Sequence, residues 1–331
     1  MTKTAVVLFN LGGPDGPEAV EPFLFNLFND PAIIGAPQPI RWLVARLISR
    51  RRAPVARDIY AQIGGRSPLV PETEAQARAL ERVLGDGYKA FIAMRYWHPF
   101  THEAVAAVKA WGAERVVLLP LYPQFSTTTT RSSLRAWRRA ATAAGLEVPT
   151  EIVCCYPDQG GLVAAMSDLV AQGVARAGPG ARVLFSAHGL PKKVVDKGDP
   201  YPLHVQQTAR AVALGLGLTD WAICYQSRVG PLEWIGPSTE AELERAGRDK
   251  VPVVVVPVAF VSEHSETLVE LDIEYRHRAD ALGIPAYMRV PAVGAHPAFI
   301  GGLAELVRAP GALTGKACAA AGRTCILETE P

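Results

Sequence analysis

Eight short apolar runs, arranged in two sets of four, limit what this chain can fold into. Continuous apolar runs of this length are typical of strands that are buried on both faces of a parallel sheet. Helical patterns separate the runs, so the sequence predicts an α/β protein with parallel sheets. The first set comprises Ala5–Leu11, Lys89–Arg95, Arg115–Leu121 and Glu151–Tyr156, and the second comprises Arg182–Ala187, Trp221–Gln226, Val253–Phe260 and Ala286–Val290.

The third runs of the two sets share a pattern that indicates an internal repeat. One reads P-L-Y-P-Q-F-S-T-T-T from Pro120, and the other reads P-V-A-F-V-S-E-H-S-E-T from Pro257. In both, hydroxyl residues precede a helix and can cap its first turn. We therefore expect two similar domains, each with a four-stranded parallel sheet flanked by helices, whose strand ends face a common cleft. The expected domains are residues 1–170 and 171–308, followed by a tail at residues 309–331.

Composition and charge exclude several classes of protein. With 49% hydrophobic and 20% charged residues, the chain is an ordinary globular protein. Its net charge of +2 argues neither for nor against a nucleic-acid partner, but the chain has no strongly basic tail and no RNA- or DNA-binding signature, so no such partner is expected. The glycines match no Walker or dinucleotide fingerprint, so no nucleotide cofactor is expected. The apolar runs are too short for a signal peptide or a membrane span, which predicts a cytoplasmic protein.

A row of glutamates follows the third strand of the second set. The stretch Val251–Tyr275 begins as an apolar run and continues as a helical pattern with Glu266, Glu270 and Glu274 at i, i+4 and i+8. Like charges on one helix face destabilise the helix, and a solvated acidic face is the simplest interpretation. The row starts, however, at a strand end, where open α/β sheets bind ligands, and His264 comes just before it. We therefore predict a metal-binding or proton-transfer role for this row.

His188 follows the first strand of the second set and adds another imidazole. A single histidine after a strand is often structural. Together with Glu266 it is a stronger candidate, because a neutral imidazole can accept a proton or bind a borderline cation. The surrounding sequence, S-A-H-G-L, is not a G-x-S-x-G elbow, so a hydrolase triad is not supported. With aromatic and apolar residues at the other strand ends, this pair suits a large flat apolar ligand and a divalent metal.

The segment Ile40–Arg52 is basic and amphipathic, with Trp42, Leu43, Leu47 and Ile48 set among five arginines. One interpretation is a helix that faces the core and ends in positive charge, which the helix dipole favours. The other is an apolar lip that touches an apolar substrate or a membrane surface. The sequence leaves both open. The second predicts a peripheral contact with the inner face of a membrane.

Seven motifs in a fixed order resemble those of the ferrochelatase family over nearly the whole chain. Each motif alone is moderately specific, but their order and spacing together are highly specific. The motifs are V-L-F-N-L-G-G-P-D from Val7, I-G-G-R-S-P-L from Ile63, M-R-Y-W-H-P-F from Met94, L-Y-P-Q-F-S-T-T-T-T-R-S-S from Leu121, F-S-A-H-G-L-P-K-K-V-V-D-K-G-D-P-Y-P from Phe185, Y-Q-S-R-V-G-P-L-E-W-I-G-P-S-T from Tyr225, and P-V-A-F-V-S-E-H-S-E-T-L-V-E-L-D-I-E-Y from Pro257.

The resemblance implies a fold, an activity and substrates. It implies two Rossmann-like (chelatase-type) domains with the porphyrin in the cleft between them. Ferrochelatases are lyases of haem biosynthesis that insert Fe²⁺ into protoporphyrin IX and release two protons as protohaem forms. Ferrous iron and protoporphyrin IX are therefore the expected partners, with Fe²⁺ as a substrate. The chain is expected to be a monomer or a homodimer.

The family motifs also assign residues to the metal. The histidine of S-A-H-x-L-P corresponds to His188, and the first glutamate after S-x-H corresponds to Glu266. The resemblance makes these two the iron-binding and catalytic pair. It extends the acidic row through Glu270 and Glu274, with His264 beside it, as a path that carries either iron or protons.

Porphyrin contacts of the family fall on the first domain of this chain. By motif position they are Leu11, Ser67, Arg95 and Tyr96. A planar macrocycle must distort before its nitrogens can take up a metal, and a tight apolar site can impose that strain.

The cysteines leave one cofactor question open. Some ferrochelatases hold a [2Fe–2S] cluster through one internal cysteine and three in the C-terminal tail, whereas here Thr127 occupies the internal position. Cys154 and Cys155 could replace it and join Cys318 and Cys325, since four thiolates suffice for such a cluster. The alternative is that all four are structural, because five cysteines with two adjacent do not form a disulfide framework.

Two other functions are compatible with the sequence. One is a chelatase for another tetrapyrrole, such as coproporphyrin. The other is a haem or porphyrin carrier without turnover. The acidic row counts against a carrier, because a carrier needs no route for metal or protons.

Overall fold

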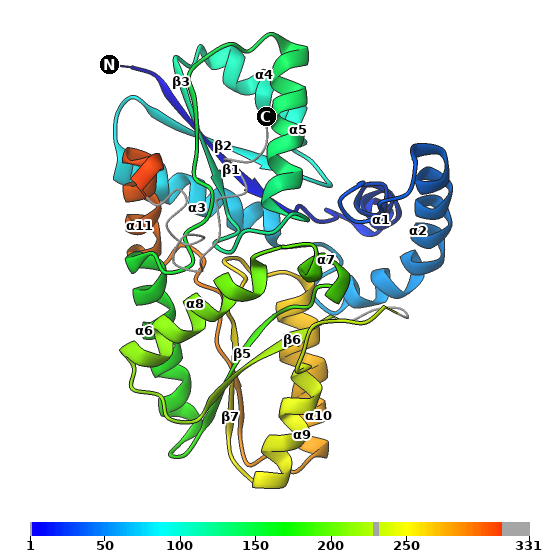
Figure 1. Ribbon diagram of the computed structural model, residues 1–331, viewed down its shortest axis with the longest axis vertical. Coiled ribbons are helices and arrows are strands. Elements are labelled where there is room, and N and C mark those ends of the chain that lie inside the picture. The colour runs from blue at the N-terminus through cyan, green and yellow to red at the C-terminus, as the bar shows by residue number, and fades with distance from the viewer. Residues whose placement is uncertain (1, 228–231, 313–331) are drawn as a thin grey trace. The chain divides into compact units, whose positions relative to one another are not determined.

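The computed structural model describes residues 2–227 and 232–312, which form two compact units (Figure 1). The first contains residues 2–154 and 306–312, and the described part of the second runs from Cys155 to Glu305. The boundary expected from the sequence, at residue 170, falls inside helix α6 (Gly160–Ala177), whereas the two units divide between Cys154 and Cys155.

The first unit is built on a four-stranded parallel sheet with strand order β2-β1-β3-β4. Its central strand β1 is buried along its whole length, as a continuous apolar run requires. The strands are β1 (Thr4–Asn10), β2 (Tyr88–Met94), β3 (Arg115–Pro120) and β4 (Thr150–Ile152). The helices are η1 (Pro17–Ala19), α1 (Val20–Phe28), α2 (Gln38–Ala61), α3 (Leu69–Leu84), α4 (Thr101–Trp111), α5 (Thr130–Ala144) and η3 (Pro310–Ala312).

The second unit repeats this design, with the strand order β6-β5-β7-β8 and all pairs parallel. The strands are β5 (Arg182–His188), β6 (Trp221–Gln226), β7 (Val253–Pro257) and β8 (Tyr287–Arg289). The helices are α6, α7 (Lys192–Asp196), α8 (Tyr201–Gly215), α9 (Thr239–Asp249), η2 (Glu266–Glu274), α10 (Tyr275–Ala281) and α11 (Pro297–Arg308), whose last turn is assigned to the first unit. The predicted fold class, two similar units with four-stranded parallel sheets, is confirmed.

Helices cover both faces of the second sheet (Figure 1). Successive residues of a strand point to opposite faces, and β7 shows this clearly. Val253 and Val255 pack with Leu243 of α9 and Ala279 of α10, whereas Val254 lies close to Gly173 of α6. Burial on both faces explains why the sequence of β7 is continuously apolar instead of alternating.

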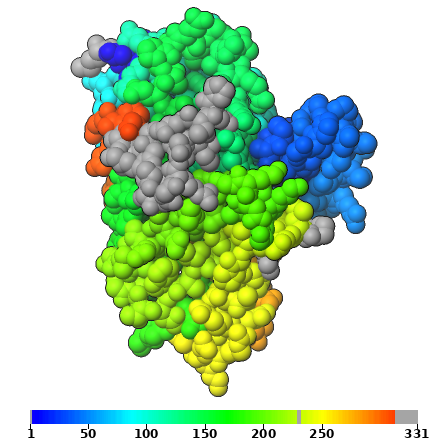
Figure 2. Space-filling model, viewed as in Figure 1, coloured from blue at the N-terminus to red at the C-terminus, as the bar shows by residue number. Residues whose placement is uncertain are grey.

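Helix α2 is longer than the predicted basic segment and is turned differently from a core-facing helix. Its buried positions include Ala45, Ser49 and Ala53, spaced four residues apart, and Ala53 belongs to the cluster that α1 and α2 share. The larger apolar side chains point outward: Ile40 is 57% exposed, and Leu43 and Leu47 are 63% and 68% exposed. Helix α2 lies within the blue region of Figure 2.

The acidic row lies on a π-helix, η2, instead of the expected α-helix. Nine residues, from Glu266 to Glu274, form this helix before the chain continues as α10. π-Helices are rare and often occur at functional sites. The wider turn changes which glutamates share a face, so the i, i+4, i+8 spacing does not carry over from an α-helix.

Candidate functional site

His188 ends β5 at the carboxyl edge of the second sheet and is paired in register with Gln226 of β6. Its Nδ1 lies 2.6 Å from the carbonyl oxygen of Gly189. A carbonyl only accepts, so Nδ1 carries the proton in this arrangement and Nε2 holds the free lone pair. This Nε2 lies 3.7 Å from Oε1 of Glu266, and the imidazole is 40% exposed. The ring can therefore accept a proton or bind a cation at Nε2.

Glu266 begins the π-helix, close to the end of the neighbouring strand β7. Burial opposes its ionisation, but the nearby imidazoles, His188 foremost, outweigh burial and hold the pKa of Glu266 below its usual value. Glu266 is therefore a carboxylate at neutral pH. The sequence placed His188 and Glu266 on different strand ends, and the structure brings them together because β5 and β7 are adjacent.

His264 supports the start of the π-helix. Its Nδ1 accepts the backbone N–H of Glu266 at 2.9 Å, and its ring packs edge-on against Phe260 with the centroids 4.5 Å apart. Burial lowers the pKa of His264, so the ring is neutral with its proton on Nε2. With Nδ1 occupied, His264 orients the backbone of Glu266 and only its Nε2 is available for another contact.

Ser227, directly after β6, joins two glutamates of the row. Its hydroxyl donates to Glu270 Oε2 and lies 3.1 Å from Glu266 Oε2, while its backbone N–H donates to Glu270 Oε1 at 2.9 Å. Ser227 has a φ of 61°, in the left-handed region that non-glycine residues seldom adopt. This backbone turn directs both of its donors toward the π-helix.

Glu270 has a raised pKa, in contrast to Glu266. Burial, reinforced by the charge of Glu266, raises its pKa from 4.5 to about 7. The hydroxyl of Tyr275 lies 3.1 Å from Glu270 Oε1 and 3.2 Å from Oε1 of Glu240 on α9. Glu270 thus sits near half-protonation at neutral pH, whereas Glu266, one turn earlier, is ionised.

Glu274 lies apart from the other glutamates of the row. It is exposed at the end of the π-helix, and no hydrogen bond or ion pair of its side chain occurs within residues 2–227 and 232–312. Over the same residues, no group of three or more His, Cys, Asp or Glu side chains is arranged to hold a metal ion. The described site is therefore the pair His188 and Glu266, continued by Ser227 and Glu270.

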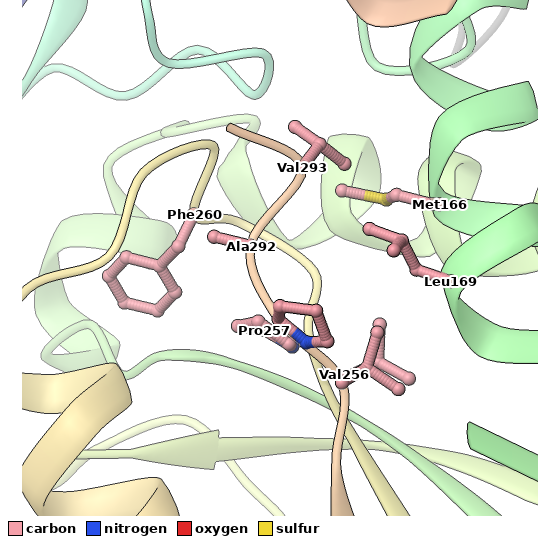
Figure 3. Close-up of a pocket in the computed structure, with 9 residues that line it drawn as sticks. Met166, Leu169, Val256, Pro257, Phe260, Ala292 and Val293 are labelled. Atoms are coloured by element: carbon pink, nitrogen blue, oxygen red, sulfur yellow. The ribbon is translucent and has the colours of Figure 1, made fainter. Parts of the chain in front are cut away.

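Two packing features fix the loop that carries His264. Arg289 of β8, 9% exposed, pairs with Glu263 and also with Asp272 of the π-helix, Nη2 to Oδ2 at 3.0 Å. On the other side, a small apolar cavity of about 10 Å³ lies at the end of β7, lined by Phe260, Pro257 and residues of α6 (Figure 3). That volume is at the lower limit for one water, so the side chains there pack closely around the end of β7.

The predicted porphyrin contacts lie together in the first unit. The backbone N–H groups of Arg95 and Tyr96 donate to the carbonyls of Asn10 and Leu11, and Ser67 donates its N–H to Pro14 in the loop that follows. All of them therefore lie near the carboxyl end of β1.

Asp30 binds two side chains of that group, those of Arg95 and Tyr96. Arg95 Nη2 lies 2.7 Å from Asp30 Oδ2, and the Tyr96 hydroxyl donates to the same oxygen at 2.9 Å. Burial raises the pKa of Tyr96 well above its usual value, and the charge of Asp30 adds to this, so Tyr96 stays neutral. Tyr96 is only 1% exposed, whereas the Arg95 side chain is 17% exposed.

Sequence reasoning missed three residues of these clusters: Ser227, Tyr275 and Asp30. Ser227 follows a predicted strand, which is a signal that a strand-end search can use. Tyr275 and Asp30 carried no such signal, because their roles depend on a π-helix and on contacts distant in the sequence.

Cys154 and Cys155 are both buried, at 2% and 1% exposure. The other two cysteines considered as cluster ligands, Cys318 and Cys325, lie outside the described residues. Among the helices that the structure describes, none has both the length and the apolar character needed to cross a membrane.

Relatives with close sequence similarity agree on one family. The family model described as Ferrochelatase matches residues 3–310. A ferrochelatase from Caulobacter vibrioides is 55% identical, with 98% of this chain and 95% of the relative covered. One from Phenylobacterium zucineum is 57% identical, with 92% and 90% covered, and one from Hyphomonas neptunium is 52% identical, with 98% and 92% covered.

Solved structures share the fold at low sequence identity. SirB from Bacillus subtilis with Fe³⁺ has a TM-score of 0.58 and 13% identity, covering 95% of this chain and 97% of SirB. The sirohydrochlorin chelatase SirB in complex with cobalt has a TM-score of 0.54 and the same identity, with 93% and 94% covered. From the family model and the high identity of its relatives, the chain belongs to the ferrochelatase family, a family of metal chelatases.

Proposed function

We propose that this protein inserts Fe²⁺ into protoporphyrin IX, forming protohaem and releasing two protons. Membership of the ferrochelatase family supports this activity. The observation that carries the proposal is the pairing of His188 Nε2 with Glu266 Oε1 at 3.7 Å, at the carboxyl edge of a parallel sheet. Iron is a substrate in this reaction and must pass from the protein to the porphyrin. A partly exposed site with only two ligands among the described residues, His188 and Glu266, binds a metal weakly enough to release it.

His188 is the proposed proton acceptor. Two pyrrole N–H groups must lose their protons as the metal enters, and a neutral imidazole with a free Nε2 can take one of them. The Gly189 carbonyl holds the ring in the required tautomer. The Glu266 carboxylate beside Nε2 stabilises the imidazolium that forms and attracts the incoming Fe²⁺.

Glu270 is the proposed next acceptor. The His188 imidazolium can give its proton to Glu266 and become neutral again. Ser227 lies against both Glu266 and Glu270, so its hydroxyl can accept that proton from Glu266 as it donates its own to Glu270. A carboxyl with a pKa of about 7 can take up and release protons at neutral pH with little driving force in either direction. These properties favour protons, and not iron, as the cargo of this part of the row.

Leu11, Ser67, Arg95 and Tyr96 are the proposed porphyrin contacts. A partly exposed guanidinium suits the propionate groups of protoporphyrin, and Asp30 holds that of Arg95 in place. Tyr96 is buried, so we assign it a supporting role under Arg95, whose guanidinium carbon lies 5.0 Å from the Tyr96 ring centroid.

The experiment is anaerobic incubation of the purified protein with Fe²⁺ and protoporphyrin IX, following the loss of porphyrin fluorescence. Many turnovers per protein molecule are expected, with heat-inactivated protein as the control. A parallel reaction with coproporphyrin separates the alternative chelatase. Stoichiometric quenching without turnover would identify a carrier, and a rate equal to the uncatalysed background would overturn the proposal.

Helix α2 supports a peripheral membrane contact. Its outward apolar side chains at Ile40, Leu43 and Leu47 lie among arginines, which is the composition of an interfacial helix. Sedimentation with vesicles tests this: binding to anionic vesicles at low salt, and none to neutral vesicles, is expected. Equal recovery of the protein in the supernatant with both vesicle types would contradict it.

The [2Fe–2S] cluster stays a prediction. The structure describes only Cys154 and Cys155 of the four proposed ligands, and their burial suits a cluster as well as a packed core. No step of the reaction above depends on it. Visible absorption with bound iron and sulfide after anaerobic purification, lost in Cys318→Ser, is the expected result. A colourless protein without inorganic sulfide would exclude the cluster.

A further inference from the structure

Tyr275 joins two carboxylates that come from different elements of the second unit. Its hydroxyl lies 3.1 Å from Oε1 of Glu270 on the π-helix and 3.2 Å from Oε1 of Glu240 in the first turn of α9. The phenol ring is buried, 5% exposed, in the core that packs α9 and α10 against the sheet. The tyrosine is thus fixed in position between an acid of the proposed site and an acid outside it.

The count of protons favours an extra proton in this network. Two hydroxyls, those of Ser227 and Tyr275, make four contacts with carboxylates, but each hydroxyl has one proton to donate. If all three glutamates were ionised, each hydroxyl would leave one oxygen–oxygen contact without a proton. A proton on Glu270 fills one of these two contacts, either the one to Ser227 or the one to Tyr275, at the centre of the network.

The hydrogen bonds from Glu270 lead through Tyr275 to Glu240 and not to Glu274. Glu274, the next glutamate of the row, is exposed and makes no hydrogen bond within the described residues. Glu240 does make one, through Tyr275, and its Oε2 is buried without a hydrogen-bond partner among those residues. A proton passed on by Tyr275 arrives at Oε1, and protonation of the carboxyl group weakens no hydrogen bond to Oε2 among those residues.

We propose that protons leave Glu270 through Tyr275 to Glu240, and not along the row to Glu274. This inference rests on the proposed function, because it names where the protons released by metal insertion go. The O–H bond of the Glu270 carboxyl breaks as its proton moves to the Tyr275 oxygen. In the same step the Tyr275 O–H bond breaks and that proton moves to Glu240, leaving a Glu270 carboxylate, a neutral tyrosine and a protonated Glu240.

The concerted transfer follows from the surroundings of the tyrosine. Burial and the two neighbouring carboxylates raise the pKa of Tyr275 far above its usual value, so a free tyrosinate is not an accessible intermediate. The hydroxyl therefore acts as a relay that accepts and donates together. Tyr275 touches neither of the proposed metal ligands, His188 and Glu266, in any contact that the structure shows.

The test compares Tyr275→Phe, Glu240→Gln and Glu274→Gln in steady-state metal insertion, with Zn²⁺ or Fe²⁺ and protoporphyrin IX. Glu244→Gln is the matched control, because Glu244 lies on the same helix as Glu240 and forms an exposed pair with Arg278. We expect Tyr275→Phe and Glu240→Gln each to lower kcat about tenfold, with unchanged KM for porphyrin and metal. This loss is smaller than the contribution of a general acid or base, because the relay carries the proton away after His188 has accepted it. Glu244→Gln is expected to match the wild type.

The double variant Tyr275→Phe/Glu240→Gln separates a relay from unrelated effects. If both residues belong to one relay, either substitution alone interrupts it. The double variant is therefore expected to be as slow as either single variant. Losses that multiply, an unaffected Tyr275→Phe enzyme, or a loss confined to Glu274→Gln would each overturn the inference. Glu240 lies in the first turn of α9, so Glu240→Gln still tests the relay if Tyr275→Phe does not fold. Absence of turnover in the wild type would instead reject the proposed function.

Discussion

Ser227 holds both carboxylate oxygens of Glu270, one through its backbone N–H at 2.9 Å and the other through its hydroxyl. This two-point contact ties the end of β6 to the π-helix. It also restrains the acidity of Glu270, because each hydrogen bond favours the ionised form while burial favours the neutral form.

Replacement of Ser227 with glycine is expected to raise the pKa of Glu270 above about 7. The hydroxyl that stabilises the carboxylate is lost, whereas the backbone N–H remains and glycine adopts the φ of 61° without strain. Infrared or NMR titration of the Glu270 carboxyl measures the shift. Ser227→Ala is the comparison, since it loses the same hydroxyl but keeps a Cβ at a left-handed position. A lower pKa in Ser227→Gly would show that the hydroxyl does not donate to Glu270.

Replacement of Glu270 with glutamine is expected to flatten the dependence of stability on pH. The pKa of Glu270 is raised in the folded state, so the folded protein binds more protons than the unfolded chain between about pH 4.5 and 7. Stability contributed by this group is therefore present at low pH and falls as the pH rises through that window. The wild type is expected to lose up to about 3 kcal/mol across it relative to Glu270→Gln.

Urea unfolding at several pH values measures this difference. The exposed Glu274→Gln is the matched control and is expected to follow the wild type. Parallel curves for the wild type and Glu270→Gln between pH 4.5 and 7 would contradict the raised pKa.

Replacement of His188 with alanine is expected to lower the rate of Fe²⁺ or Zn²⁺ insertion by about 10²–10⁴-fold, the usual contribution of a general base. The side chain is 40% exposed, so the fold is expected to survive with a nearly unchanged melting temperature. His102→Ala, at an exposed position of the first unit, provides the control. Near-normal insertion by His188→Ala would remove His188 from the mechanism.

Replacement of Arg289 with methionine is expected to destabilise the protein by about 3–5 kcal/mol, because it breaks the ion pair between the buried guanidinium and the largely buried Glu263. Asp272 also loses one of its two arginine partners and keeps the other, Arg276. Arg278→Met breaks only an exposed pair with Glu244, and its expected cost is about 1 kcal/mol or less. Denaturant unfolding of the two variants makes the comparison. Similar losses in both would show that Arg289 does not fix the π-helix against β8.

Strands were predictable from this sequence because their physics is local. Trp221–Gln226 begins and ends as expected, and the other runs differ by a few residues at their ends. β7 stops at Pro257, three residues before the predicted end, because a turn follows directly. The paired motifs at Pro120 and Pro257 also predicted the repeated design, which appears as the same strand order in both sheets.

The helices that carry function were harder to predict. Glutamates at i, i+4 and i+8 fit an α-helix, but hydrogen bonding in the folded protein selects a π-helix, and no pattern of side chains distinguishes the two. For α2, the sequence left open whether the large apolar residues face the core or point outward. In the structure they point outward, and the inward face is formed by Ala45, Ser49 and Ala53, with Tyr60 at its end. The three small side chains let this part of the helix approach its neighbour closely.

That orientation of α2 predicts different effects on stability for a substitution on its inward face and one on its outward face. Ala45→Leu adds a side chain to a fully buried position and is expected to cost about 1–3 kcal/mol. Leu47→Ser changes a side chain that is 68% exposed and is expected to stay within about 0.5 kcal/mol of the wild type. Thermal unfolding distinguishes them. A larger loss in Leu47→Ser would mean that this side chain packs against the protein.

The outward side chains of α2 also have a thermodynamic meaning. Full burial of a leucine or isoleucine releases about 1.5–3 kcal/mol, and Ile40, Leu43 and Leu47 leave most of that amount unrealised in this fold. Binding of an apolar partner to this surface would bury these side chains and release that free energy. The adjacent arginines favour a partner that also carries negative charge.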